Sequence, residues 1–191
     1  MSVEIVKKML QMGANVNAQD NTGFTPLHRA VQKYKNVEIA EILLEYGAFV
    51  DHQNNARKAT PLMMAIQNRC GPDLVQILIK NGANLEINDV NGWTALIYAA
   101  YYPNCLPLAE VLVDSGAVID VQTGSTYENL KKRTSIQAGT TPLMLACAKN
   151  DEDLARLLLS NGANLNVKNT KGISARQLIS DTLFRRLFDN G

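Results

Sequence analysis

Residues 81–87 have the sequence NGANLEI, and similar phrases occur at four other places: MGANVNA, YGAFVDH, SGAVIDV and NGANLNV. Each phrase follows a run rich in Leu, Ile and Val. The phrases recur at intervals of 34, 35, 34 and 46 residues, counted between the glycines Gly13, Gly47, Gly82, Gly116 and Gly162. A period of this length indicates a repeat protein in which each repeat is one supersecondary unit. The longer last interval marks a repeat that departs from the others.

The stretch from Asp20 to Gln53 shows what one repeat contains. Thr25 can cap a helix N-terminus, and Pro26 is tolerated in the first turn because its missing N–H has no intrahelical partner. A second helix is predicted from Val37 to Tyr46, where apolar residues recur at helical spacing. Gly47 follows, at a position that often needs a left-handed backbone. Each repeat is therefore expected to be two helices and a hairpin-like arm.

The same order returns along the chain, with further second helices predicted at Asp73–Asn81, Pro107–Ser115 and Asp151–Asn161. One such unit cannot bury its apolar face alone, so it must stack on a neighbour. The sequence therefore predicts a stack of helix pairs.

The motif T-P-L-H-R-A at residues 25–30 resembles the signature of the ankyrin repeat, and looser copies begin at Thr60, Thr94 and Thr141. The resemblance covers essentially the whole chain. It implies an all-α ankyrin-repeat solenoid, which consists of stacked helix-turn-helix pairs with β-hairpin fingertips. It also implies the family's usual role, which is binding another protein without catalysis. Analogy from a fold does not name that partner.

Aligned on this repeat, residues 1–191 are expected to form a single domain. Its predicted parts are an N-terminal half repeat at 1–19, repeats at 20–53, 54–88 and 89–122, a repeat with a long insertion at 123–168, and a C-terminal capping repeat at 169–191. Arg176 stands where leucine is expected, and with Arg185 and Arg186 it suits a polar cap. The half repeat suits either a minimal cap or a piece of a longer array.

Aromatic residues of the third full repeat are the predicted anchors of a partner site. The usual contact surface in ankyrin-like stacks is the concave side, made of fingertips and the exposed ends of first helices. Trp93, at a position that we expect to face solvent, lies there with Tyr101 and Tyr102, and aromatic residues are enriched among interface hot spots. The predicted flanking residues are Phe24, Lys33, Arg57, Lys58 and Lys149. Alternatively, the rings pack on one another or on the insertion.

The insertion at about 124–137 lengthens one fingertip on the binding side. It contains Tyr127 and the basic run Lys131, Lys132 and Arg133, all of which are candidate partner contacts. Long loops in compact domains are often functional. However, doubling a loop costs only about 0.6 kcal/mol in closure entropy, so an insertion can persist without a role. Similarly, the glycine-free turn at Arg57 and Lys58 is either a positive contact point or a tolerated irregular turn.

Composition and motifs favour binding over chemistry. The formal charge of +1 gives no reason to expect nucleic acid as a partner, and the longest apolar stretch, at 95–102, is too short to span a membrane. His28 is interpreted as structural, and no catalytic motif is present. We expect a monomeric, intracellular, cytoplasmic protein with no cofactor, no metal and no enzymatic activity; the nucleus or a host cell is an alternative location.

Two alternatives to a scaffold or adaptor function remain at this stage. The chain can be a non-catalytic segment of a larger multidomain enzyme or of a pathogen effector. It can also be an inhibitor or regulator that contacts its target through the insertion at about 124–137 rather than through the concave face.

Overall fold

The threonine of each T-P-L or T-A-L motif lies immediately before a helix in the computed structural model, which describes residues 2–129 and 134–180. Thr25, Thr60 and Thr141 have extended backbones, and their hydroxyl oxygens accept a hydrogen bond from the third residue of the helix that follows. The first helices of the repeats are α2 (Pro26–Arg29) with the π-helical turn η1 (Ala30–Tyr34), α4 (Pro61–Gln67), α6 (Ala95–Tyr101), α8 (Pro142–Lys149) and α10 (Ala175–Ser180).

The second helices match the predicted ranges to within one residue at each end. They are α3 (Val37–Glu45), α5 (Pro72–Lys80), α7 (Leu106–Asp114) and α9 (Glu152–Ser160), and α1 (Val3–Gln11) belongs to the N-terminal half repeat. The backbone after α3 is left-handed at Gly47, with φ +84°, as predicted. In the part of the chain that is described, no helix has both the length and the apolar character needed to cross a bilayer.

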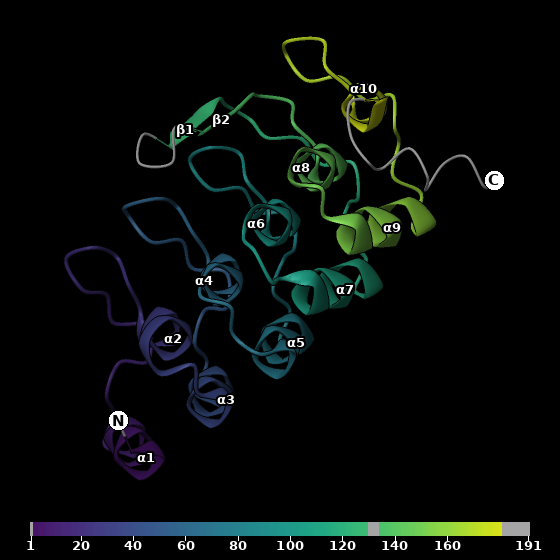
Figure 1. Cartoon of the computed structure of the whole chain (residues 1–191). Coiled ribbons are helices and arrows are strands. Elements are labelled where there is room, and N and C mark those ends of the chain that lie inside the picture. Colours follow the sequence, from purple (N-terminus) through teal and green to yellow (C-terminus); the bar gives the residue numbers. More distant parts are fainter. Residues whose placement is uncertain (1, 130–133, 181–191) are drawn as a thin grey trace. The chain divides into compact units, whose positions relative to one another are not determined.

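The chain divides into two compact units, Met1–Val90 and Asn91–Gly191. In the first unit, α2 packs on α4, α3 packs on α5, and α1 packs on α3 (Figure 1). In the second unit, α8 contacts both α6 and α10, and α7 packs on α9 (Figure 1). First helices thus contact first helices and second helices contact second helices, which confirms the predicted all-α ankyrin-repeat fold.

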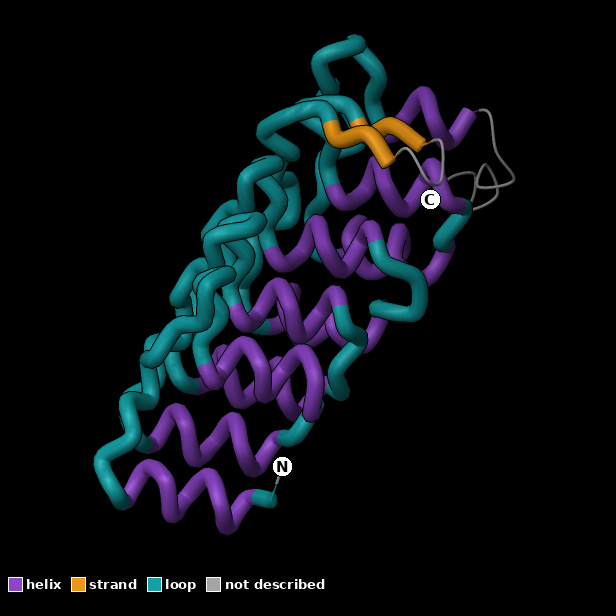
Figure 2. Tube along the Cα trace, turned by 90° about the vertical axis from the view of Figure 1, so that its left-hand side faces the viewer, coloured by secondary structure: helices purple, strands orange, loops and turns teal. Residues whose placement is uncertain are grey.

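The fingertips are turns that gather along one side of the helices within each unit, as Figure 2 shows. In the first of them, the N–H of Asp20 donates to the carbonyl of Phe24 over 3.0 Å. Only the insertion contains named strands among the described residues: β1 (Tyr127–Asn129) and β2 (Thr134–Ile136), which pair antiparallel with Tyr127 opposite Ile136. The segment that the sequence suggested as a loop therefore contains a two-stranded antiparallel sheet.

Candidate functional site

Aromatic rings gather around the loop before α6 and the end of α6 in the second unit. The ring centroid of Trp93 lies 5.5 Å from that of Tyr98, 4.9 Å from Tyr101 and 5.0 Å from Tyr127, with steep angles between the planes. Tyr102 joins this aromatic cluster through Tyr101, with 5.0 Å between their centroids. Tilted pairs of this kind contribute about 0.5–1.5 kcal/mol each beyond area burial.

Trp93 does not face solvent, and the prediction that it does is wrong. Its exposed fraction is 3%, because Tyr98, Tyr101 and Tyr127 surround the indole. The alternative interpretation, that the rings pack on one another and on the insertion, describes this residue. Tyr101, Tyr102 and Tyr127 are only half-buried, so each of these residues retains some exposed surface.

Lys149, predicted as a flank of the partner site, joins two helices of the second unit. Its ammonium group donates to the carbonyl oxygen of Ala100 over 2.8 Å and to that of Tyr101, the last residue of α6. It also lies 4.8 Å from the centroid of the Tyr101 ring. These carbonyls carry the negative end of the helix dipole, so the lysine charge stabilises the end of α6.

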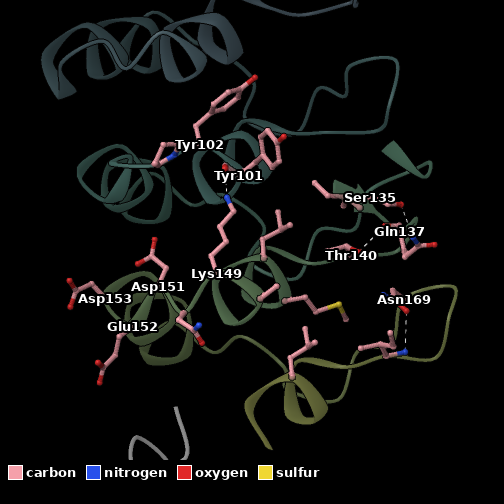
Figure 3. Close-up of a pocket in the computed structure, with 18 of the residues that line it drawn as sticks. Tyr101, Tyr102, Ser135, Gln137, Thr140, Lys149, Asp151, Glu152, Asp153 and Asn169 are labelled. Atoms are coloured by element: carbon pink, nitrogen blue, oxygen red, sulfur yellow. Dashed lines mark hydrogen bonds between the residues drawn. The ribbon is translucent and has the colours of Figure 1, made fainter. Parts of the chain in front are cut away.

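A cavity of about 930 Å³ opens beside the aromatic cluster (Figure 3). Its walls come from the end of α6, the strand β2, the helix α8 with the start of α9, and the last repeat. The apolar part of its lining consists of Met144, Leu145, Ala148, Ile173 and Leu178 together with Ile136. The volume lies within the range of about 300–1,000 Å³ that is usual for ligand pockets. We call this cavity the α8 groove.

Carboxylates line one side of the α8 groove, where α9 begins. The Asp151 carboxylate caps α9 by accepting a hydrogen bond from the N–H of Leu154 over 3.1 Å. Glu152 pairs with Arg156 one turn further along the helix. Asp153 is exposed, and it has no ion pair within residues 2–129 and 134–180. Figure 3 shows Asp151, Glu152 and Asp153 on the side of the groove opposite Ser135 and Gln137.

The insertion is anchored at its base and forms a wall of the α8 groove. The N–H of Thr123 donates to the carbonyl of Thr140 over 3.0 Å, and both hydroxyls donate to the carbonyl of Gln137, over 2.8 Å and 2.7 Å. Ser135 and Ile136 of β2, with Gln137, line the groove, whereas no residue of β1 does. Lys131, Lys132 and Arg133 lie outside the described residues, so their partner-binding role stays a prediction.

Two of the predicted flanking residues lie in the first unit near α2. Phe24 is half-buried, and the guanidinium of Arg29 lies 4.3 Å from its ring centroid. Arg29 in turn forms an ion pair with Asp20. Lys33 lies in the π-helical turn η1 and is exposed. The Phe24 ring therefore already has a cation on one face, and the partner-binding roles of both residues remain predictions.

The turn at Arg57 and Lys58 has a left-handed residue where the other fingertips have a glycine. Lys58 has φ +57°, at a repeat position where Gly23 and Gly92 have φ +75° and +71°. The N–H of Arg57 donates to the side chain of Asn54 over 3.0 Å, which helps to hold this conformation. A lysine in the left-handed region is uncommon and costs free energy relative to glycine. The partner-binding roles of Arg57 and Lys58 remain predictions.

The histidine that the sequence marked as structural is fully buried. The N–H of Thr25 donates to Nδ1 of His28 over 3.2 Å, so the ring proton lies on Nε2, which is 3.1 Å from the carbonyl oxygen of Ala59. Burial is the main cause that lowers the pKa of His28 from 6.5 to about 4. The imidazole is therefore neutral near pH 7 and joins two successive repeats by hydrogen bonds.

No metal-binding cluster of His, Cys, Asp and Glu occurs within the described ranges. Cys70, Cys105 and Cys147 are buried thiols without disulfide bonds, and burial raises the pKa of Cys147 to about 11. A thiol of this kind is protonated near pH 7 and is a poor nucleophile or metal ligand. These cysteines pack as small apolar side chains.

Sequence reasoning identified two walls of the α8 groove but not the groove itself. Tyr101, Tyr102 and Lys149 were predicted, and the insertion was marked as a departure from the repeat. Thr140 and Ala148 were also expected on the contact surface, but residues such as Ile173 and Leu178 were missed because the groove combines residues far apart in the sequence. The one available signal was that Met144 and Ala148 share a face of α8, four residues apart.

Comparison with known proteins agrees with this architecture. The family model for ankyrin repeats in three copies matches residues 1–54 and 50–123, and the single ankyrin repeat model matches residues 138–170. The crystal structure of the ankyrin repeat domain of Bcl-3, described as a unique member of the IkappaB protein family, superposes with a TM-score of 0.78. It is 24% identical, and the match covers 93% of this chain and 75% of that one. At this identity the likeness concerns the fold.

Curated relatives are considerably longer than this chain. The human SH3 and multiple ankyrin repeat domains protein 2 is 29% identical over 168 residues, which cover 88% of this chain and 8% of the relative. The B-cell lymphoma 3 protein homolog of Mus musculus is 31% identical over 183 residues, which cover 82% of this chain and 40% of the relative. The chain thus spans less than half of each. Because the family models match most of its length, the chain belongs to the ankyrin repeat family.

Proposed function

We propose that this chain is a scaffold or adaptor that binds a partner protein through the α8 groove, without catalysis. Ankyrin repeats are protein-interaction modules. The observation that carries the proposal is the groove itself, a cavity of about 930 Å³ beside accessible aromatic rings. Concave apolar sites with a few polar groups are usual for small ligands, and aromatic residues at such a surface are enriched among the hot spots of protein interfaces.

The groove replaces the concave site predicted from sequence, and it changes which residues anchor the partner. Trp93 is buried and is not one of the residues that line the groove, so it contributes by packing against Tyr101 rather than by touching the partner. Tyr101 and Tyr102 line the groove. Lys149 also lines it, while the ammonium group of this lysine stabilises the end of α6. The insertion contributes a wall, so the proposed site combines the predicted Tyr101, Tyr102 and Lys149 with part of the insertion.

The lining favours binding over chemistry. Its described titratable groups are the carboxylates at the start of α9, the ammonium of Lys149 and the two tyrosines. The lining includes Ser135 and Thr140, but among its described residues no histidine is present to act as their base, as nucleophilic catalysis would require. An intracellular, monomeric protein that does not bind nucleic acid remains our prediction.

A photo-crosslinking amino acid introduced at Ala148 tests the proposal. Ala148 is exposed and lines the groove, so the substitution preserves the fold and places the crosslinker against a bound partner. The matched control carries the same amino acid at Gln11, which is exposed on α1 in the other unit. We expect the Ala148 variant to give a protein adduct in cell extract that the Gln11 variant does not give. Identical adducts from both positions would contradict the proposal.

A further inference from the structure

We propose that the α8 groove binds an extended segment of the partner, which adds to β2 as a third strand. This inference rests on the proposed function and specifies the partner's chemistry. The segment places an apolar side chain on α8 and a basic side chain toward the carboxylates of α9.

The edge of β2 favours an extended backbone in the bound segment of the partner. Within the described residues β1 and β2 form a two-stranded sheet, so each strand has one edge without a neighbouring strand. In an antiparallel ladder, alternate residues direct their N–H and C=O groups away from the paired strand. Ser135 and Ile136 point to opposite faces of the sheet, yet both line the groove, and no residue of β1 does. From this we infer that the outer edge of β2 borders the cavity. An added strand would lie about 4.8 Å from β2, inside the groove.

The surface of α8 forms the floor of the groove and favours an apolar side chain in the bound segment. Met144 and Leu145 are buried at 2% and 5% exposure, and they form a solid base on the helix α8. Ala148 is exposed and small, which leaves room above the helix for a larger side chain. A strand's side chains alternate between its two faces, so every second side chain of the segment would point to this floor.

The carboxylates across the groove favour a positively charged side chain in the bound segment. The described lining contains Asp151, Glu152 and Asp153, against the single ammonium of Lys149, which is bonded to carbonyls of α6. Glu152 is paired with Arg156, so the net negative charge comes from Asp151 and Asp153. Complementary charge contributes more to the choice of partner than to the total binding affinity. A lysine or arginine in the segment, facing α9, meets this condition.

A phage-displayed library of random dodecapeptides, selected on the full chain, provides the test. Selected peptides are synthesised and measured against the chain and against Ala148→Arg, which fills the floor. Gln11→Arg is the control with the same change of charge. Each peptide is then methylated at one backbone nitrogen at a time. Because β2 is three residues long, we expect binding to weaken about tenfold at alternate nitrogens only within the few peptide residues that pair with it, as for the loss of one backbone hydrogen bond.

Two results would overturn different parts of the argument. If Ala148→Arg binds every selected peptide as tightly as the unchanged chain does, the groove is not the site and the proposed function fails. If binding depends on Ala148 but methylation has no alternating effect, strand addition fails and the proposed function stands. The charge is tested with Asp153→Asn against Asp114→Asn, an exposed control on α7. Equal peptide affinities for those two variants would overturn the proposal that the segment directs a basic side chain toward α9.

Discussion

The ring of Trp93 packs against the ring of Tyr127, with 5.0 Å between centroids and 65° between planes. Trp93 belongs to the loop before α6, whereas Tyr127 belongs to strand β1 of the insertion. The insertion is therefore attached to the repeat scaffold by an aromatic contact and by the threonine hydrogen bonds at its base. It thereby holds β2 at the wall of the α8 groove.

Replacing Tyr127 with alanine is expected to expose the indole of Trp93. The change removes one of the rings that cover the indole, and we expect the free energy of unfolding to fall by about 2 kcal/mol. Trp93 is the single tryptophan of the chain, so its fluorescence emission should shift to longer wavelength. Tyr46→Ala, at a tyrosine that is 40% exposed, is the control and should leave the spectrum unchanged. An unshifted spectrum for Tyr127→Ala would contradict the contact.

His28 is expected to make the free energy of unfolding decrease as the pH is lowered. In the folded chain its pKa is lowered to about 4 from 6.5, so between these values only the unfolded chain binds the proton. The stabilisation is therefore fully present above about pH 6.5 and is lost as the pH falls toward 4, by up to about 3 kcal/mol. Urea denaturation across this range checks the slope. His28→Gln should be less stable at neutral pH but should vary less with pH; equal slopes would refute the assignment.

The left-handed turn residues are expected to respond oppositely to glycine and alanine. Lys58→Gly relieves a side chain at φ +57°, and we expect the free energy of unfolding to rise by about 1 kcal/mol. Gly92→Ala should lower it by more than that, because a Cβ there would lie 2.3 Å from the backbone nitrogen of Gly124. Thermal denaturation of both variants gives the comparison. A loss of stability in Lys58→Gly would mean that the lysine side chain contributes contacts.

Ile5 on α1 and Ile39 on α3 provide a matched pair of substitutions. Ile5 and Ile39 occupy the same position in successive second helices, yet Ile5 is 56% exposed and Ile39 is 1% exposed. In the described residues α1, α2 and α5 all pack on α3, which carries Ile39, whereas α1, which carries Ile5, packs on α3. Ile39→Ser should therefore cost about 4 kcal/mol, and Ile5→Ser should stay within about 0.5 kcal/mol. Comparable losses in chemical denaturation would show that the Ile5 side chain is covered.

Much of the fold could be predicted from the sequence because its signals are local. Thr25, Pro26 and Gly47 act through their own backbone conformations and through hydrogen bonds a few residues away. The apolar spacing of each second helix then identified the buried face. These signals recur in every repeat, so helix positions could be placed within one residue.

The burial of Trp93 and the existence of the α8 groove depended on the tertiary structure. Whether a fingertip residue faces water depends on which segment packs over it, and that segment was Tyr127, more than thirty residues away along the chain. The strands of the insertion are three residues each, too short for a period of two to be visible in the sequence. The sequence by itself determined the repeat, because backbone preferences and helical periodicity are local. The site was decided by packing between distant segments, and no local pattern records that packing.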